Sequence, residues 1–347
     1  MRGFASRIVA KTQKDDAVFV WFYRKNAEPF ECNTLNVGVE RGFYREGEFN
    51  VDDDITDLEK KFAPFVNRIR ELEDGAKISD RIFLEFIVHL TLRTKHIRES
   101  LIDVGAFAND NLLGHFADQQ KLRNYLVRLL TNRRDILMDA FEKDLKKINV
   151  AKFKKLLARV FIKYAPSQLL IRMVDAAIPE MAESFKSAQV HIAQNLKQIA
   201  KQAHIQSLLK NLVPEPRVEF FQQLHWHIRR PKEPLILGDV CCLFRMSNSQ
   251  YVSIGGSNDE IERVYLPISQ DCLIVGDRNS ELPSICVAEL NEASAKVSRN
   301  YFISSLSSPD MLRLSKLIDT EADLLSESEM EQLLGEAWSE SLKKQRG

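Results

Sequence analysis

A few carboxylates and histidines stand at positions where side chains of folded proteins do chemistry. Asp239 directly follows a short apolar segment, residues 235–237, and Glu40 stands at the end of an extended segment near the N-terminus. A carboxylate at the end of a strand can act as a general base, bind a metal or cap the next turn. Convergence of Glu40, Asp239 and a histidine in one pocket is the best active-site hypothesis that the sequence offers. The alternative for Asp239 is turn capping.

His225 and His227 are two residues apart on a predicted strand, so their side chains lie on one face. Two such histidines can chelate a metal when a third ligand converges from elsewhere. The sequence identifies no third ligand, and a solvent-facing polar surface is the alternative. The sequence therefore predicts no metal site and no cofactor, and the two histidines stay candidates for imidazole chemistry.

A polar stripe interrupts an otherwise apolar predicted helix. Glu85, His89 and Arg93 follow one another at four-residue steps, and His96 falls within about 40° of the first two at helical spacing. A glutamate and a histidine four residues apart can share a metal, but Arg93 would repel the cation. The spacing favours a hydrogen-bonded network, or an anion site to which Arg98 adds.

The cysteines and the hydropathy pattern limit the classes of protein to which the chain can belong. Five cysteines without a Cys-x-x-Cys spacing predict neither a disulfide framework nor a zinc site, and Cys241-Cys242 lies in an apolar context that favours inert thiols. The N-terminus lacks the apolar core of a signal peptide, and the longest apolar run, residues 82–92, contains Glu85 and His89. We expect a soluble, cytoplasmic protein with no membrane contact.

A net charge of zero conceals two charged blocks. Residues 121–163 hold thirteen Lys or Arg against four Asp or Glu, and residues 319–340 hold eight acidic residues and no basic one. The first block is a candidate surface for nucleic acid or an acidic protein, and the second could mimic such a partner. Solvated helix faces are the alternative for both. The candidate contacts in the first block are Lys146, Lys147, Lys154 and Lys155.

The period of the apolar residues changes twice along the chain. Residues 17–45 are β-branched and aromatic and predict two strands, at 18–23 and 35–39. Apolar residues then recur at three- and four-residue steps, which predicts helices. These helices are expected at 54–72, 80–98, 119–147, 151–164 and 182–212. Strict alternation over the eleven residues 218–228 predicts a strand whose second face carries His225 and His227.

Short strands and two helices are expected in the remainder. The strands are expected at 235–237, 241–245, 251–254, 263–268, 272–275, 285–287 and 301–304, and the helices from 289 and from 309. The pattern predicts an α+β fold in which N-terminal and C-terminal strands form one sheet system, because two strands are not stable alone. Four regions follow: N-terminal strands (1–50), a helical region (51–213), a β-rich region (214–306) and an acidic helical tail (307–347).

The order of several short motifs resembles the family called domain of unknown function 4238, a mostly bacterial family without an assigned activity. The matching steps are Arg2-Gly3-Phe4-Ala5, Glu40 with Phe43-Tyr44, Arg93-Thr94 with Arg98, and Trp226. The resemblance spans nearly the whole chain. It implies a bacterial protein and no particular reaction.

The chain departs from the family pattern at two places. The family's His-Tyr-x-Pro stretch is missing ahead of Arg2, and its Thr-Ser-Asp-Asn-Pro motif aligns with Leu237-Gly238-Asp239-Val240-Cys241, which keeps only the aspartate. The Pro-Leu-Ser step is kept as Pro267-Ile268-Ser269, and the asparagine before a helix as Asn291. The eroded motif favours a binding or regulatory module. The alternative is an enzyme or toxin-like effector on a phosphate-containing substrate, with Arg93 and Arg98 as the anion contacts.

Overall fold

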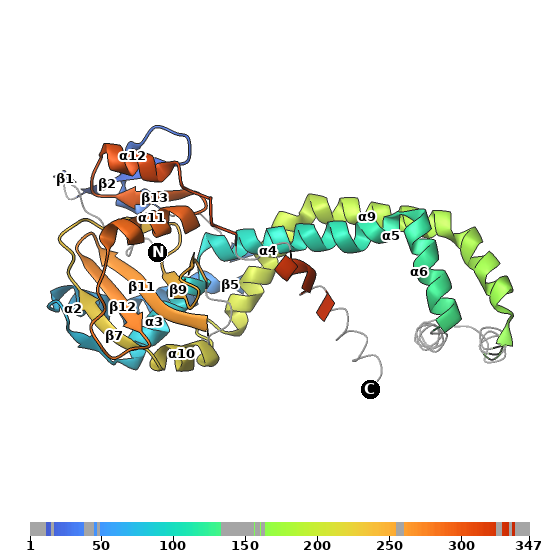
Figure 1. Ribbon diagram of the computed structural model, residues 1–347, viewed down its shortest axis with the longest axis horizontal. Coiled ribbons are helices and arrows are strands. Elements are labelled where there is room, and N and C mark those ends of the chain that lie inside the picture. The colour runs from blue at the N-terminus through green and yellow to red at the C-terminus, as the bar shows by residue number, and fades with distance from the viewer. Residues whose placement is uncertain are drawn as a thin grey trace. The chain divides into compact units, whose positions relative to one another are not determined.

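The computed structural model describes residues 12–14, 17–37, 45–46, 49–132, 156, 160, 164–254, 260–323, 328–332 and 335–336 (Figure 1). The chain divides into two compact units. The first comprises Met1–Leu101 with Ala200–Gly347, and the second is Ile102–Ile199. The division falls inside two helices, α4 (Lys95–Ala108) and α9 (Ser167–Lys210). Each unit has its own core.

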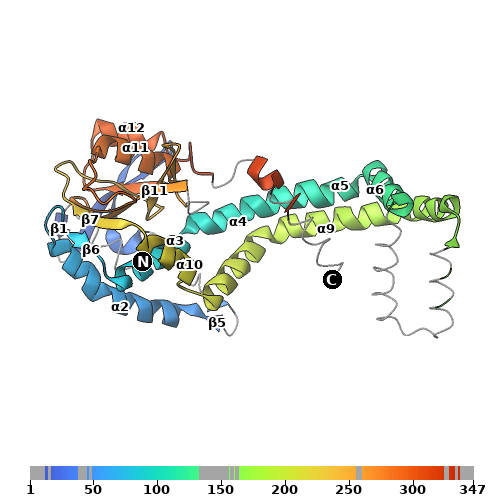
Figure 2. The same cartoon turned by 60° about the horizontal axis from the view of Figure 1, so that its bottom comes forward.

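The described part of the second unit is helical. Besides parts of α4 and α9 it contains the π-helical turn η2 (Asn109–Leu113), α5 (Gly114–Ala117) and α6 (Gln119–Asn132). Leu122 of α6 and Ile178 of α9 are buried together in a small core. The C-terminal end of α4 lies along α9 in both views, and so does α5 (Figure 1, Figure 2).

The first sheet joins the two ends of the chain. Its strands are β1 (Thr12–Lys14), β2 (Ala17–Arg24), β3 (Phe30–Asn33), β8 (Leu237–Gly238) and β13 (Tyr301–Ser304). The order is β1-β2-β13-β8, with β3 paired to β2, and every pair is antiparallel. The predicted pairing of N-terminal with C-terminal strands is therefore confirmed. The helix α12 (Pro309–Ser315) packs on one face of this sheet.

The second sheet is built mainly from the C-terminal half and is antiparallel in the order β10-β9-β11-β12-β7-β6. Its strands are β6 (Lys77–Ile78), β7 (His225–Arg229), β9 (Leu243–Met246), β10 (Tyr251–Val252), β11 (Ile261–Ser269) and β12 (Cys272–Asp277). One face packs against α2 (Val51–Glu71), α3 (Arg81–Leu92) and α10 (Glu215–Gln222), and α11 (Val287–Val297) covers apolar residues of the other. A separate hairpin pairs β4 (Arg45–Glu46) with β5 (Phe49–Asn50), and the 3-10 turn η1 (Thr34–Asn36) follows β3. The α+β class is confirmed.

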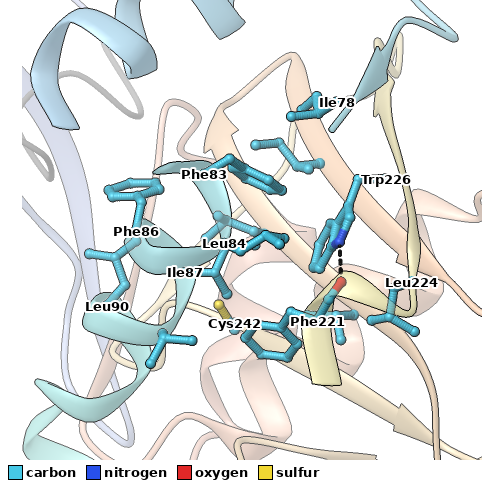
Figure 3. Packing of buried hydrophobic residues seen from close by; sticks show 14 of the residues in the cluster. Ile78, Phe83, Leu84, Phe86, Ile87, Leu90, Phe221, Leu224, Trp226 and Cys242 are labelled. Carbon is cyan, nitrogen blue, oxygen red and sulfur yellow. Dashed lines mark hydrogen bonds between the residues drawn. The ribbon is translucent and has the colours of Figure 1, made fainter. Parts of the chain in front are cut away.

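Trp226 lies at the centre of the main core (Figure 3). Its indole meets the ring of Phe83 edge-on at 5.0 Å between centroids, and its Nε1 donates to the Phe221 carbonyl at 2.8 Å. On the neighbouring strand, Gly276 pairs with Trp226, and the indole lies where a β-carbon of residue 276 would be. Gly276 thus makes room for the ring.

Two predicted elements are wrong in a way that affects candidate residues. Residues 215–222 form α10 rather than the start of the predicted strand 218–228, and only 225–229 are extended. Pro214 and Pro216 stand at the N-terminus of α10, where proline is well tolerated. The predicted helix 80–98 is two helices, because α3 ends at Leu92 and α4 begins at Lys95.

Two further predicted strands are wrong over the residues that the structure describes. Residues 34–36 form η1, where Asn33 caps the turn by accepting from the Leu35 N–H at 2.9 Å. Residue 287 begins α11 instead of ending a strand. In contrast, α2, β13 and the pair β11 and β12 lie close to the predicted positions, and α2 continues through Pro64.

Candidate functional site

Asp239 is the centre of the richest polar cluster that we identify in the described residues. It directly follows β8, as the sequence predicts, and its carboxylate accepts three hydrogen bonds. The donors are the backbone N–H of Arg299 at 3.0 Å, the backbone N–H of Asn300 at 2.7 Å and the Asn300 side-chain amide at 3.0 Å. Its own N–H donates to the Tyr301 carbonyl at 3.0 Å. The side chain therefore fastens the end of β8 to the segment that enters β13.

Glu99 of α4 extends this cluster. The Asn300 amide nitrogen lies 3.0 Å from both Glu99 Oε2 and Asp239 Oδ2, so its two hydrogens serve two carboxylates. Lys95 lies 3.0 Å from Glu99 and donates to Asn300 Oδ1 at 3.3 Å. The cluster thereby connects the first turns of α4 to the loop before β13.

The two carboxyls of the cluster differ in their electrostatics. Burial raises the pKa of Asp239, and the three N–H donors offset this effect only in part. Burial also acts to raise the pKa of Glu99, but hydrogen bonds from Lys95 and Asn300 outweigh it and hold that pKa below its usual range. A pair of carboxyls with separated pKa values is the usual arrangement for acid and base roles. Here, however, the Asp239 oxygens already accept bonds from the protein itself.

His96 of α4 lies next to this cluster and contacts Ser253. Ser253 is not among the candidates predicted from the sequence. The Ser253 Oγ lies 3.0 Å from His96 Nε2, a distance at which a histidine can activate a serine. Burial, and next the Arg299 charge, lower the pKa of His96. Both side chains are buried, at 1% exposure for His96 and 6% for Ser253. The pair therefore fastens α4 to the end of β10, and no sequence signal links residues so far apart.

The predicted polar stripe divides into two groups. Glu85 pairs with Lys61 at 2.8 Å and with Arg81 at 3.3 Å, at the surface of α3. His89 Nε2 lies 3.0 Å from Arg93 Nη1, which also donates to Glu59 of α2 at 2.7 Å. The structure therefore brings His89 and Arg93 together and leaves Glu85 with other partners.

The remaining stripe residues follow the second helix. The helix is interrupted between α3 and α4. The helical spacing that predicted His96 beside His89 therefore does not apply. Arg98 is buried in α4, and its charge acts on His204 of α9. His204 Nε2 donates to the Leu92 carbonyl at 2.9 Å and so satisfies a backbone acceptor at the end of α3.

The two β7 histidines do not share one environment. His225 is exposed, whereas His227 is buried at 2% exposure, so the predicted solvent-facing surface is wrong for His227. His227 is flanked by Val275 of β12 and Lys77 of β6, whereas His225 has a strand neighbour on the β12 side only. Burial, and next the Lys77 charge, lower the pKa of His227. Both histidines belong to β7 of the second sheet, whereas Asp239 follows β8 of the first.

Several candidate residues lie outside the described residues. Glu40 is one of them, so its predicted convergence with Asp239 stays a prediction. The same holds for the four candidate lysines of the basic block, Lys146, Lys147, Lys154 and Lys155.

An apolar cavity of about 20 Å³ lies beside the cluster, next to β8. Cys241 lines it together with Leu237 and Asn291, and burial raises the pKa of the Cys241 thiol to about 11, as an inert thiol requires. Asn291 donates to the Pro234 carbonyl at 2.9 Å and accepts from the Ile236 N–H at 3.0 Å. A space of this size holds about one water molecule.

Neither a metal centre nor a membrane span is found in the part of the chain that the structure describes. No three His, Cys, Asp or Glu side chains there are grouped so that they could hold a metal ion. No described helix combines the length and apolar character needed to cross a bilayer.

The comparisons with known proteins identify a family but no activity. Neither a curated protein nor a solved structure matches the chain. The sequence profile of DUF4238, described as a protein of unknown function, matches residues 1–305. This match covers Asp239, Asn291 and Trp226. Asp239 accepts the three hydrogen bonds that join the end of β8 to the segment entering β13, an arrangement that we call the clasp. Asn291 is bonded to residues just ahead of β8, and Trp226 lies in the main core. The chain belongs to the DUF4238 family.

Proposed function

We propose that the protein is a non-catalytic binding or regulatory module whose second unit contacts nucleic acid. The observation that carries the proposal is a separation of charge between the two units. Residues 102–199 hold sixteen Lys and Arg against ten Asp and Glu, a net charge of +6, and the rest of the neutral chain therefore carries −6. A compact unit with this excess attracts polyanions at a distance set by the ionic strength.

The described side chains of this unit are consistent with a basic, exposed surface. Lys121 and Arg128 of α6 are exposed, and Arg123 is partly neutralised by Asp175 of α9 at 2.7 Å. Tyr164 is 70% exposed and follows Lys163 in the sequence. An exposed aromatic ring next to a cation can stack on an unpaired base.

The polar cluster in the first unit supports a non-catalytic role. Asp239 directs its oxygens at three N–H groups of the protein, and His96 and Ser253 are both buried. A general base needs a free oxygen or nitrogen within reach of a substrate proton. The cluster is therefore better suited to holding elements together than to chemistry.

Charge reversal in the basic block is the direct test. The variant with Lys146, Lys147, Lys154 and Lys155 all changed to Glu should lose binding to a fluorescent single-stranded DNA of about 20 nucleotides at about 50 mM salt. For the unaltered protein, the logarithm of the association constant should fall with the logarithm of the salt concentration by about 0.7 per phosphate contacted. Fluorescence anisotropy measures both quantities.

The matched control carries four Lys-to-Glu changes in the first unit, at the exposed Lys60, Lys77, Lys232 and Lys316. This control has the same total charge as the test variant, but its changes lie outside the second unit, so it should bind DNA at least half as well as the unaltered protein. Equal loss of binding in both variants would mean that only net charge matters. No binding by the unaltered protein would refute the proposal, and binding of an acidic protein alone would replace nucleic acid as the partner.

A further inference from the structure

We propose that the junction between α3 and α4 is an acid-sensitive latch, in which uptake of a proton by His89 breaks the chain of hydrogen bonds His89–Arg93–Glu59. This inference concerns the first unit and is independent of nucleic-acid binding.

The latch depends on which atom donates. A guanidinium carries only N–H donors, so His89 Nε2, 3.0 Å from Arg93 Nη1, must be the acceptor and must be unprotonated. The second hydrogen on the same Nη1 serves Glu59 Oε1 at 2.7 Å. His89 thus carries its single proton on Nδ1, beside the Leu212 carbonyl.

Protonation of His89 is incompatible with this geometry. A proton on Nε2 would direct one donor at another and place two positive charges about 3 Å apart. The His89 end of this chain of hydrogen bonds is buried, with His89 at 1% exposure and Arg93 at 6%, whereas Glu59 is 40% exposed. Among the described residues, the charged groups that act on the ring are Arg93 and Glu59. Burial, and next Arg93, lower the pKa of His89 to about 3.

A local opening at the junction would affect both helices that the two units share, α4 and α9. Arg93 is the C-cap of α3, and α4 begins two residues later and continues into the second unit. His204, on the other helix shared by both units, donates to the Leu92 carbonyl at the same point. Burial, opposed only in part by this hydrogen bond, lowers the pKa of His204 as well. Loss of the His89–Arg93 bond would therefore loosen the segment to which α9 is attached.

The direction of the pH effect follows from the lowered pKa. An open junction exposes His89, whose pKa then returns to about 6.5, so the open form binds the proton that the closed form excludes. The latch is at full strength above about pH 6.5 and weakens as the pH falls below it. Well below pH 6.5 the open population should rise about tenfold per pH unit, and between pH 6.5, where the exposed histidine is already half protonated, and pH 5.0 it should rise about 16-fold.

Hydrogen exchange measured by mass spectrometry tests the latch on the full chain. Opening of peptides within residues 81–100, corrected for intrinsic exchange, should increase at least about 16-fold from about pH 6.5 to 5.0 in the unaltered protein. In His89→Gln the amide oxygen still accepts from Arg93 but does not titrate, so the share of the increase due to His89 should be absent. Only the increase contributed by the buried His96 and His204, whose pKa values are also lowered, should remain. His225→Gln removes an exposed histidine and should keep the full response. An equal response in His89→Gln, or none in the unaltered protein, would overturn the proposal.

A second measurement on the unaltered protein covers the case in which His89→Gln does not fold. Nitrogen-15 NMR of the histidine side chains at about pH 7 should report the Nδ1–H tautomer for His89. The Nε2–H tautomer, or titration of His89 near pH 6.5 without any change in the surrounding signals, would contradict the latch.

Discussion

Gly276→Ala is expected to lower the free energy of unfolding of the first unit by about 3 kcal/mol. A β-carbon at this position would lie 2.7 to 2.8 Å from three atoms of the Trp226 indole. The ring cannot move away, because Phe83 and Phe221 pack edge-on against it and its Nε1 is bonded to the Phe221 carbonyl (Figure 3). Urea denaturation followed by circular dichroism measures the loss.

Two variants separate this clash from a general effect of adding a methyl group. Gly335→Ala is the matched control, because nothing lies within 4 Å of its β-carbon, and it should not lower the free energy of unfolding. Trp226→Leu makes room at Gly276, so the double variant Gly276→Ala with Trp226→Leu should lose less than the sum of the two single losses. Simple additivity would contradict the proposed contact.

Asp239→Asn is expected to destabilise the protein by about 3 kcal/mol and to be nearly as harmful as Asp239→Ala. The carboxylate accepts from three N–H groups on two residues. An amide would direct its own N–H₂ at one or more of these donors and leave them without an acceptor in a buried place. Thermal and urea unfolding at about pH 7 measure the loss.

The control for Asp239 is an exposed aspartate whose partner can adapt. Asp271 accepts from the Ser269 hydroxyl at 2.6 Å, and the amide oxygen of Asp271→Asn could accept from the same hydroxyl. That variant should lose less than about 0.5 kcal/mol. A stable, fully folded Asp239→Asn would refute the clasp and would return Asp239 to the candidates for catalysis.

The hydrogen bonds of Asp239 give this aspartate a structural role. Its partners Arg299 and Asn300 lead into β13, and Asn291 anchors residues 234 and 236 just ahead of β8. Both residues therefore hold the segment around β8, which forms one edge of the first sheet. Asp239 and Asn291 thus each have a structural role at this edge.

Local pattern was sufficient where a segment interacts with its surroundings through one repeating face. The apolar residues of α2 recur at helical spacing and pack on the main core, and the alternating residues of β11 and β12 lie between two layers, so all three elements appear near their predicted positions. The strand pairing of β2 with β13 followed from a general requirement, because two isolated strands are not stable.

Local pattern failed where distant partners decide the conformation. Residues 218–228 alternate as in a strand, but Val218 and Phe221 are also spaced as on one face of a helix. Both are buried in the main core, and this packing selects the helix. The predicted helix 80–98 stops at Leu92, where His204 satisfies the exposed carbonyl from a helix more than one hundred residues away. No periodicity within the segment carries this information.

The sequence by itself determined the class of fold, the family and the charge excess of the basic block, because these depend on composition, motif order and short-range spacing. Only the tertiary structure decided the partners of the polar residues. Asp239 meets Asn300, His96 meets Ser253, and His227 becomes buried on an inner strand. A buried polar group is stable only with a suitably placed partner, and the position of that partner is set by the packing of segments far apart in the chain.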